Sequence, residues 1–355
     1  MKKLLYAIFL VCYCFVFGEM FVRVFNPTPL MPRYVTAAPY GVRMNVPNAQ
    51  YWQTTPETQV QIRINAQGMR SDKEYPFKKA EKECRILLYG DSFFMGYEVD
   101  LKDSFTYLLE QKLNAEGYPC EVINLAVSGF GTAEMLIALQ NEGLKYQPDV
   151  VIFQWHSTDL TDNVRSMLFK INAENQLVRF KANYLPAIKI RDWLSQFTVY
   201  RWLIENSQLY SAIREAAAKR IKAILASIRQ PNKAITGKVK KRKNVYPRRL
   251  SVSLLQEAKR ISNGNNAQFG ALEIPDRISR TKFVSHLSKF EPEVRKQLNM
   301  FTPISNFVEA ANPEVKIYFE KGHSHLTPYG NSLLTEYFIS ELKATNWLKD
   351  FRIKK

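Results

Sequence analysis

Apolar and polar residues follow two alternating periodicities between positions 85 and 155. Short apolar runs lie at 85–89, 122–126 and 150–155, and the segments between them, Ser104–Asn114 and Thr132–Leu139, carry apolar residues at helical spacing. The short runs predict buried strands, and the spacing between them predicts amphipathic helices. Crossovers of helix length join parallel strands, so we expect an α/β fold with a parallel sheet covered on both faces.

Each predicted strand is followed by polar residues, namely Asp91-Ser92, Ser128-Gly129 and His156–Asp159. The carboxyl ends of parallel strands meet at one edge of a sheet, where ligands bind in such folds. We therefore expect these three loops to contribute to one site.

The same rhythm returns near the C-terminus, with a predicted helix at Leu254–Ile261, a strand at 269–274 and a final helix at Asn331–Leu342. Residues 165–265 interrupt it as a helical insert, in which 193–228 predict one or two amphipathic helices. A basic stretch, Lys238–Arg249, follows. It is either a solvated surface segment or a patch that meets anionic lipid headgroups or polymers.

The N-terminus has the pattern of an export signal. Lys2 and Lys3 precede an apolar run from Leu4 to Phe17, and positive residues at such a position tend to stay in the cytoplasm. Cleavage after Gly18 would release the protein, whereas a helix that continues to Phe25 would reach the ~20 residues needed to span a bilayer. We favour the uncleaved anchor.

These patterns predict four segments. A membrane anchor occupies residues 1–25, and a Pro-rich lead-in over 26–80, with a small strand or two, packs on the main domain. The main domain spans 81–345, and residues 346–355 form a tail.

Composition narrows the classes of partner. The formal net charge is +17, from 50 Lys and Arg against 33 Asp and Glu, and 46% of residues are hydrophobic. The hydrophobic fraction excludes global disorder. The charge permits binding to nucleic acid, anionic lipid or acidic polymers. No aromatic-interleaved RNA motif, zinc finger or basic zipper accompanies it, so we expect no nucleic acid.

Two of the four cysteines predict a disulfide. Cys84 and Cys120 each stand immediately before a predicted strand, and the two strands are consecutive. If the strands are neighbours, their starts lie side by side, and an exported protein could form a Cys84–Cys120 bridge. The alternative is two independent buried thiols.

Gly90-Asp91-Ser92 is the first candidate for chemistry. A Ser just past a buried parallel strand has its hydroxyl at the rim of the sheet and its amide near a helix N-terminus, where the local dipole favours a developing anion. A serine hydroxyl needs an imidazole within hydrogen-bond reach to become a nucleophile.

Four blocks resemble the SGNH/GDSL hydrolase family in order and spacing: Gly90–Ser92, Asn124–Thr132, Thr158–Asn163 and His325–Gly330. The resemblance covers roughly residues 60–165 and 266–345. It implies a three-layer, flavodoxin-like α/β fold around a central parallel sheet.

The resemblance also implies roles for individual residues. Ser92 would be the nucleophile and His325 the base, and the amides of Ser92 and Gly129 would hold the oxyanion together with a side chain at position 158. Asp91, Asp159 and Asn163 are candidates for supporting roles.

The chain departs from the family pattern at two places. Thr158 stands where the family has an Asn, and its hydroxyl is a shorter donor. Gly322 and His323 occupy the positions of the Asp that orients the base, whose loss could cost up to about 10⁴ in rate. Either a Ser–His dyad operates, with the base oriented by a backbone carbonyl or by Glu320, or the site has lost its activity.

His323 also raises a rival hypothesis. Together with His325, His156 and Asp159 it could form a metal site, because neutral imidazoles bind transition metals. We favour a backbone-bonded rim histidine at position 156, and assign neither a metal nor a cofactor.

The expected function is that of a membrane-anchored, extracytoplasmic ester hydrolase or O-acyltransferase, periplasmic in a Gram-negative cell, acting on a cell-envelope glycan or lipid. The resemblance implies O-acetyl groups on polysaccharides as one substrate class. The alternative is a non-catalytic glycan-binding or assembly protein that keeps the fold.

Overall fold

A five-stranded parallel sheet forms the centre of the computed structural model, which describes residues 1–228 and 245–352. The strands are β5 (Cys84–Tyr89), β6 (Cys120–Asn124), β7 (Val150–Trp155), β10 (Gln268–Glu273) and β13 (Met300–Phe301). Their order across the sheet is β6-β5-β7-β10-β13. This 2-1-3-4-5 order is that of flavodoxin-like folds, as the resemblance to the SGNH/GDSL family implies.

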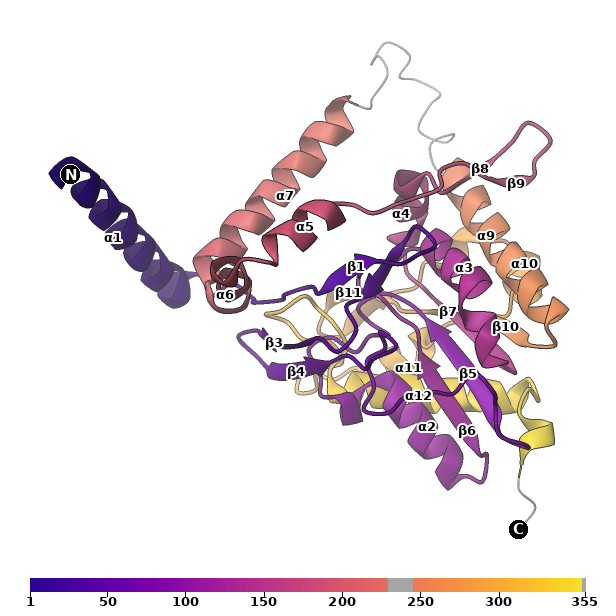
Figure 1. Cartoon of the computed structure of the whole chain (residues 1–355). Helices are drawn as coiled ribbons and strands as arrows, with labels where there is room; N and C mark the ends of the chain where they lie inside the picture. The colour runs from indigo at the N-terminus through magenta and orange to yellow at the C-terminus, as the bar shows by residue number, and fades with distance from the viewer. Residues whose placement is uncertain (229–244, 353–355) are drawn as a thin grey trace.

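Helices cover both faces of the sheet (Figure 1). One face packs against α2 (Phe105–Ala115), α11 (Ile304–Glu309) and α12 (Pro328–Ala344), and the other against α3 (Thr132–Asn141), α9 (Val245–Gly264) and α10 (Pro292–Gln297). In β5 the side chains alternate between the two layers, with Leu88 in the first core and Leu87 in the second. Burial on both sides explains why the strand sequences are continuous apolar runs.

Short elements connect these layers. They are the 3₁₀ turns η1 (Leu101–Asp103), η2 (Gly143–Tyr146), η3 (Leu287–Lys289) and η4 (Lys349–Phe351), and the hairpin of β11 (Asp276–Ser279) and β12 (Lys282–Val284). The hairpin directly follows β10, at the carboxyl edge of the sheet.

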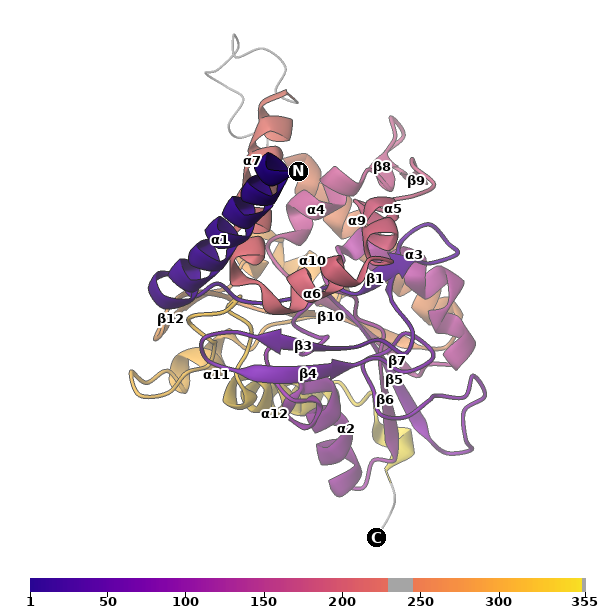
Figure 2. The same ribbon diagram turned by 60° about the vertical axis from the view of Figure 1, so that its left-hand side comes forward.

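The lead-in segment forms two antiparallel hairpins, more strand than the sequence predicts. They are β1 (Val35–Ala37) with β2 (Arg43–Asn45), and β3 (Gln50–Thr54) with β4 (Gln59–Arg63). Figure 2 shows the second hairpin between α6 (Thr198–Asn206) and α2. Tyr51, Val60 and Ile62 are buried in the core below it, so this segment is part of the main domain.

The insert contains more elements than the expected one or two helices. After α4 (Asp159–Ser166) come the hairpin β8 (Phe169–Ile171) and β9 (Leu177–Arg179), then α5 (Ile188–Leu194), α6 and α7 (Gln208–Ile228). Helix α9 begins at Val245, earlier than predicted, and takes in the end of the basic stretch. The part of that stretch over 238–244 lies outside the described residues.

Helix α1 (Lys2–Phe25) projects from the rest of the molecule (Figure 1). None of its residues is buried, and it is long and apolar enough to cross a membrane. An N-terminal signal sequence has the same properties.

Cys84 and Cys120 lie opposite each other in β5 and β6, as the strand order requires, but both are free thiols, so the predicted disulfide is absent. Side chains at paired positions of neighbouring strands point the same way from the sheet, about 4.8 Å apart. A disulfide needs Cβ atoms about 3.8 Å apart and turned toward each other. The hydrogen bond between the two thiols, together with burial, raises the pKa of Cys84.

Candidate active site

Ser92 and His325 come together at the carboxyl edge of the sheet. Ser92 follows β5, His325 precedes α12, and Ser92 Oγ lies 2.8 Å from His325 Nε2. The rings of Phe93 and Tyr97 contact the imidazole, with centroid separations of 5.1 and 5.6 Å. The distance is within the range that proton transfer between a hydroxyl and an imidazole requires.

The turn that carries Ser92 is shaped by Asp91 and Gln154. Asp91 Oδ1 accepts from the Phe93 N–H at 2.9 Å and from Gln154 Nε2 at 2.7 Å. Gln154 Oε1 in turn accepts from the Asp91 N–H at 3.0 Å. A Cβ at Gly90 would lie 2.4 Å from that oxygen, so only glycine fits. The Asp91 side chain thus holds the backbone of the turn in place.

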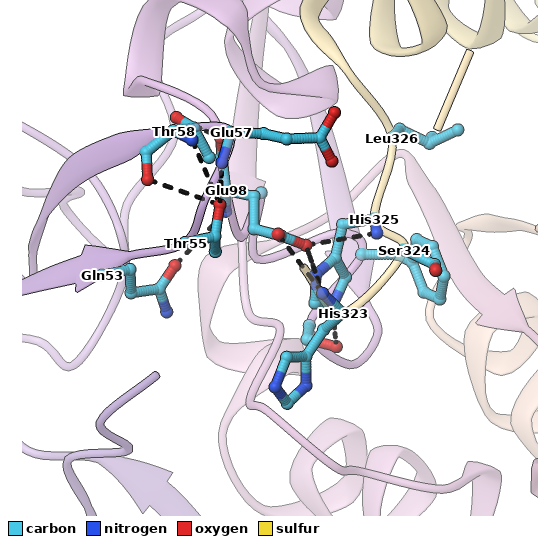
Figure 3. Close-up of polar contacts among 12 residues, drawn as sticks. Gln53, Thr55, Glu57, Thr58, Glu98, His323, Ser324, His325 and Leu326 are labelled. Atoms are coloured by element: carbon cyan, nitrogen blue, oxygen red, sulfur yellow. Dashed lines mark hydrogen bonds and ion pairs between the residues drawn. The ribbon is translucent and has the colours of Figure 1, made fainter. Parts of the chain in front are cut away.

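Glu98 is the carboxylate behind the imidazole (Figure 3). Its Oε2 lies 2.6 Å from His325 Nδ1 and also accepts from the backbone N–H groups of His323 and His325, at 3.1 and 3.3 Å. The side chain is 0% exposed. Because a carboxylate only accepts, the Nδ1 atom of His325 carries the proton and Nε2 is free to accept from the Ser92 hydroxyl.

Glu98 occupies the space that an Asp at position 322 would fill. A Cβ added to Gly322 would lie 1.5 Å from Glu98 Oε1. The orienting carboxylate is therefore present, but it comes from the loop after Ser92 rather than from the segment before His325. The expectation of a Ser–His dyad without a carboxylate was wrong.

Glu320 and His323 do not orient the base. Glu320 instead binds the guanidinium of Arg280, at 2.6 and 2.8 Å. The ring of His323 lies 3.5 Å from Glu215 of α7, and only its backbone N–H reaches Glu98. Glu320 as an orienting group is thus a second expectation that the structure corrects.

The lead-in segment holds the backbone of Glu98, which has a left-handed φ of 67°. Gln53 Oε1 accepts from the Glu98 N–H at 3.3 Å, and Thr58 Oγ1 donates to the Glu98 carbonyl at 3.2 Å (Figure 3). Left-handed backbone is unfavourable for a residue with a Cβ and persists where neighbours enforce it.

Arg70 holds the loop after Ser92, which carries Glu98. Its buried guanidinium donates to the carbonyls of Met95 and Val99, at 3.0 and 2.6 Å, and to that of Gly96. Burial lowers the pKa of Arg70 to about 10, so it stays charged at neutral pH.

Gly129 sits in the second loop with a left-handed φ of 80°. Arg43 Nη2 donates to its carbonyl at 2.5 Å and to Glu134 at 2.7 Å, so the loop is pinned by a buried ion pair from the lead-in. Within the described part of the chain, neither the Gly129 N–H nor the Ser92 N–H donates a hydrogen bond. Both amides remain available to a ligand.

Asp159 and Asn163 tie α4 to the start of α3. Asp159 accepts from the N–H groups of Thr132 and His156, at 3.0 and 2.8 Å, and Asn163 Oδ1 accepts from Ala133 at 2.9 Å. Burial raises the pKa of Asp159 to about 8. Both side chains act on backbone position.

Thr158 belongs to a second chain of polar groups. Its Oγ1 lies 2.9 Å from His156 Nδ1, and His156 Nε2 lies 2.8 Å from Asp276 of the β11–β12 hairpin. Asp276 also contacts His286 at 2.6 Å. Burial opposes the charged form of His156, but the hydrogen bond to Asp276 and nearby carboxylates outweigh it and raise the His156 pKa.

The side chains that the rival metal hypothesis brings together have different partners in the structure. His156 faces Asp276, whereas His325 faces Glu98. Among the residues that the structure describes, no group of three or more His, Cys, Asp or Glu side chains is arranged to hold a metal ion.

Comparison with protein-family models and with curated protein sequences gave no match. The solved structures that are similar to this chain include an esterase, a GDSL-like lipase and members of the lipolytic G-D-S-L family. TesA shares 14% identity over 73% of this chain and 98% of its own, with a TM-score of 0.37. The psychrotrophic esterase EstA from Pseudoalteromonas sp. shares 14% over 74% and 98%, with a TM-score of 0.38. A G-D-S-L family member from Veillonella parvula shares 11% over 73% and 98%, with a TM-score of 0.37.

The sequence analysis missed Glu98 and Asp276. One signal for Glu98 was available: it is flanked by Tyr97 and Val99 in a segment rich in aromatic and apolar residues, which is the composition of a buried segment. Asp276 gave no local signal, because its partner His156 is 120 residues away in the sequence.

We expect Asp276→Asn to lower the pKa of His156, because the substitution removes the carboxylate that favours the imidazolium. Histidine ring-proton NMR over a pH titration of the full chain in detergent measures the shift. Ser157→Ala is the matched control, since it removes only a 2.8 Å hydrogen bond to Asp276. An unchanged His156 pKa in Asp276→Asn would contradict the assignment.

The raised pKa also has a consequence for stability. Because the folded pKa of His156 lies above the value of 6.5 for the free side chain, its pairing stabilises the fold below pH 6.5. That contribution is lost as the pH rises through the folded pKa, and should be absent in Asp276→Asn.

Proposed function

We propose that this chain is a serine ester hydrolase or O-acyltransferase of the SGNH type, acting outside the cytoplasm on a cell-envelope glycan or lipid. The observation that supports it most is the continuous chain of contacts Ser92–His325–Glu98, at 2.8 and 2.6 Å. A hydroxyl, an imidazole and a buried carboxylate in this order form the arrangement used for acyl transfer on several unrelated folds.

In the proposed reaction, His325 Nε2 takes the proton of Ser92 as Oγ attacks the ester carbonyl carbon. Charge develops on the carbonyl oxygen, and the amides of Ser92 and Gly129 meet it. The tetrahedral intermediate collapses as the alcohol leaves with the proton from His325 Nε2. Water or a sugar hydroxyl then repeats these steps on the acyl-enzyme, with His325 as the base. Glu98 orients the imidazole and stabilises its charged form.

Thr158 is proposed as the third donor to the oxyanion, in place of the Asn of the family. When His156 is protonated on both nitrogens, its Nδ1–H donates to Thr158 Oγ1, 2.9 Å away. The hydroxyl proton of Thr158 is then free for the substrate. The raised pKa of His156 favours this doubly protonated state. Asp276, which contributes to that shift, would therefore help to keep the Thr158 hydroxyl proton free for the substrate.

The proposed location rests on α1. Lys2 and Lys3 precede its apolar stretch, which favours a cytoplasmic N-terminus and an exported domain. The net charge of +17 suits an acidic polymer or anionic headgroups, and the Lys238–Arg249 stretch remains a proposed contact for them.

The first test is labelling with a fluorophosphonate probe, which reacts with activated serines. We expect the full-length protein in detergent to be labelled and Ser92→Ala not to be labelled, with Ser157→Ala as a control labelled like the wild type. A wild-type protein that resists the probe yet binds an envelope polysaccharide would support the alternative, a non-catalytic glycan-binding protein.

The second test moves the carboxylate. Glu98→Gly suits the left-handed backbone and should lower kcat/KM on an acetyl ester by about 10³- to 10⁴-fold, because the base loses its orientation. Adding Gly322→Asp to that variant should recover at least about 10-fold. Gly322→Asp alone should be inactive, since its Cβ meets the Glu98 carboxylate.

A double variant no faster than Glu98→Gly would contradict the role of Glu98. Far-ultraviolet circular dichroism of each variant separates loss of orientation from loss of fold.

The third test concerns Thr158. Thr158→Val keeps the shape but removes the donor, and should lower kcat/KM by about 10²- to 10³-fold, as for other oxyanion donors. Thr158→Ser keeps the hydroxyl and should stay within a few-fold of the wild type. If Thr158→Val retains full activity in the same acetyl-ester assay, its hydroxyl does not meet the developing charge.

A further inference from the structure

The insert carries an unusual share of the exposed apolar surface. Among the described residues of α5, α6 and α7 and of the turn between α5 and α6, six large apolar side chains are between 49% and 71% exposed: Ile190, Trp193, Phe197, Val199, Trp202 and Ile213. Outside α1 and the insert, exposed side chains of this kind are scattered singly. Grouped aromatic and aliphatic side chains on a surface mark an interaction site.

The start of α7 lies against the C-terminal end of α1 (Figure 1). Glu19 accepts from Ser207 Oγ and from the N–H groups of Gln208 and Leu209, at 2.7, 2.9 and 3.0 Å, and so caps the start of α7. Arg23 Nη2 donates to the Asn206 carbonyl at 2.6 Å. The first turn of α7 is thus fixed to the last turns of α1.

The length of the apolar stretch sets the level of this junction. Leu4 to Gly18 is free of charged residues and, at 1.5 Å per residue, spans about 22 Å. The hydrocarbon core of a bilayer is about 30 Å thick. Because the charge-free stretch of α1 is shorter than this core, its flanking residues, and the start of α7 that is bound to Glu19, are drawn toward the headgroups.

The exposed side chains of the insert are of the kinds found at the headgroup level of a bilayer. Trp is enriched at membrane interfaces, where its ring sits among the headgroups. Lys189 and Arg201 are exposed on the same helices and suit anionic lipid. Helices with apolar and cationic faces typically lie in the plane of the interface.

The candidate active site is close to the same helix. Glu215 lies six residues after Leu209 in α7, about 9 Å along its axis, and contacts the ring of His323 at 3.5 Å. His323 and His325 are parallel, with centroids 6.3 Å apart. The base is therefore next to the helix that starts at the membrane junction.

We infer that α5–α7 lie on the bilayer surface as a second membrane contact and present the Ser92 site to it. The substrate class would then be an ester on a lipid or a lipid-linked glycan, held at the headgroup level, rather than a free polymer. The substrate part of this inference rests on the proposed function, whereas the membrane contact does not.

The contact is tested with the full-length protein in vesicles of phosphatidylcholine and phosphatidylglycerol whose acyl chains are brominated near the headgroup. Bromine quenches tryptophan fluorescence at short range. We expect strong quenching in the wild type, at least a twofold loss of it in Trp193→Phe/Trp202→Phe, and unchanged quenching in the control Trp347→Phe. Quenching that persists in the double variant would overturn the inference.

The substrate class is tested with two acetyl esters that differ only in their alkyl chain: acetylated methyl glucoside in water and acetylated dodecyl glucoside in the same vesicles. Trp193→Ser/Phe197→Ser/Trp202→Ser should lower acetate release from the vesicle-bound ester at least tenfold and leave the soluble ester unchanged. Phe77→Ser, also an exposed aromatic at 51%, is the matched control and should affect neither.

An equal loss on both esters, or a loss on neither, would overturn the lipid-linked substrate. If the wild type releases acetate from neither ester and resists the fluorophosphonate probe, the proposed function fails. The quenching result then still decides the membrane contact, because it does not depend on catalysis.

Discussion

The carboxylate of Glu98, sealed from solvent beneath His325, is the constraint on which the site depends. An ionised carboxylate is costly to bury unless donors surround it. Here the donors are the His325 ring and the backbone N–H groups of His323 and His325. The chain before His325 must therefore pass close to Glu98, and only glycine at position 322 allows that approach.

The same constraint explains why the lead-in segment is built into the domain. A left-handed Glu98 needs partners for its backbone, and Gln53 and Thr58 supply them from β3 and the turn after it. Arg43 of β2 holds the Gly129 loop in a similar way. Residues before the first strand of the sheet thus position both the acid behind the base and the amide expected at the oxyanion.

Local pattern was enough to predict the parallel sheet and its main helices, which follow from periodicity and from the crossovers of helix length. The pairing of Ser92 with His325 was implied by the resemblance to the SGNH/GDSL family and not by any local pattern. The role of Glu98 was not predicted because its partner, His325, lies 227 positions away in the sequence. A contact between such distant residues produces no recognisable spacing in the sequence. The disulfide prediction failed for a related reason: adjacency of two strands was foreseen, but the direction of the two Cβ atoms was not.

The segment that carries the base is held from two sides. Glu98 binds its backbone from within the domain, and Glu215 of α7 meets the His323 ring from the insert. Since α7 is capped by Glu19 of α1, the position of the base is linked through short polar contacts to the helix that is long and apolar enough to cross a membrane. The insert thus contacts both α1 and the segment that carries the base, through Glu19 and Glu215 respectively.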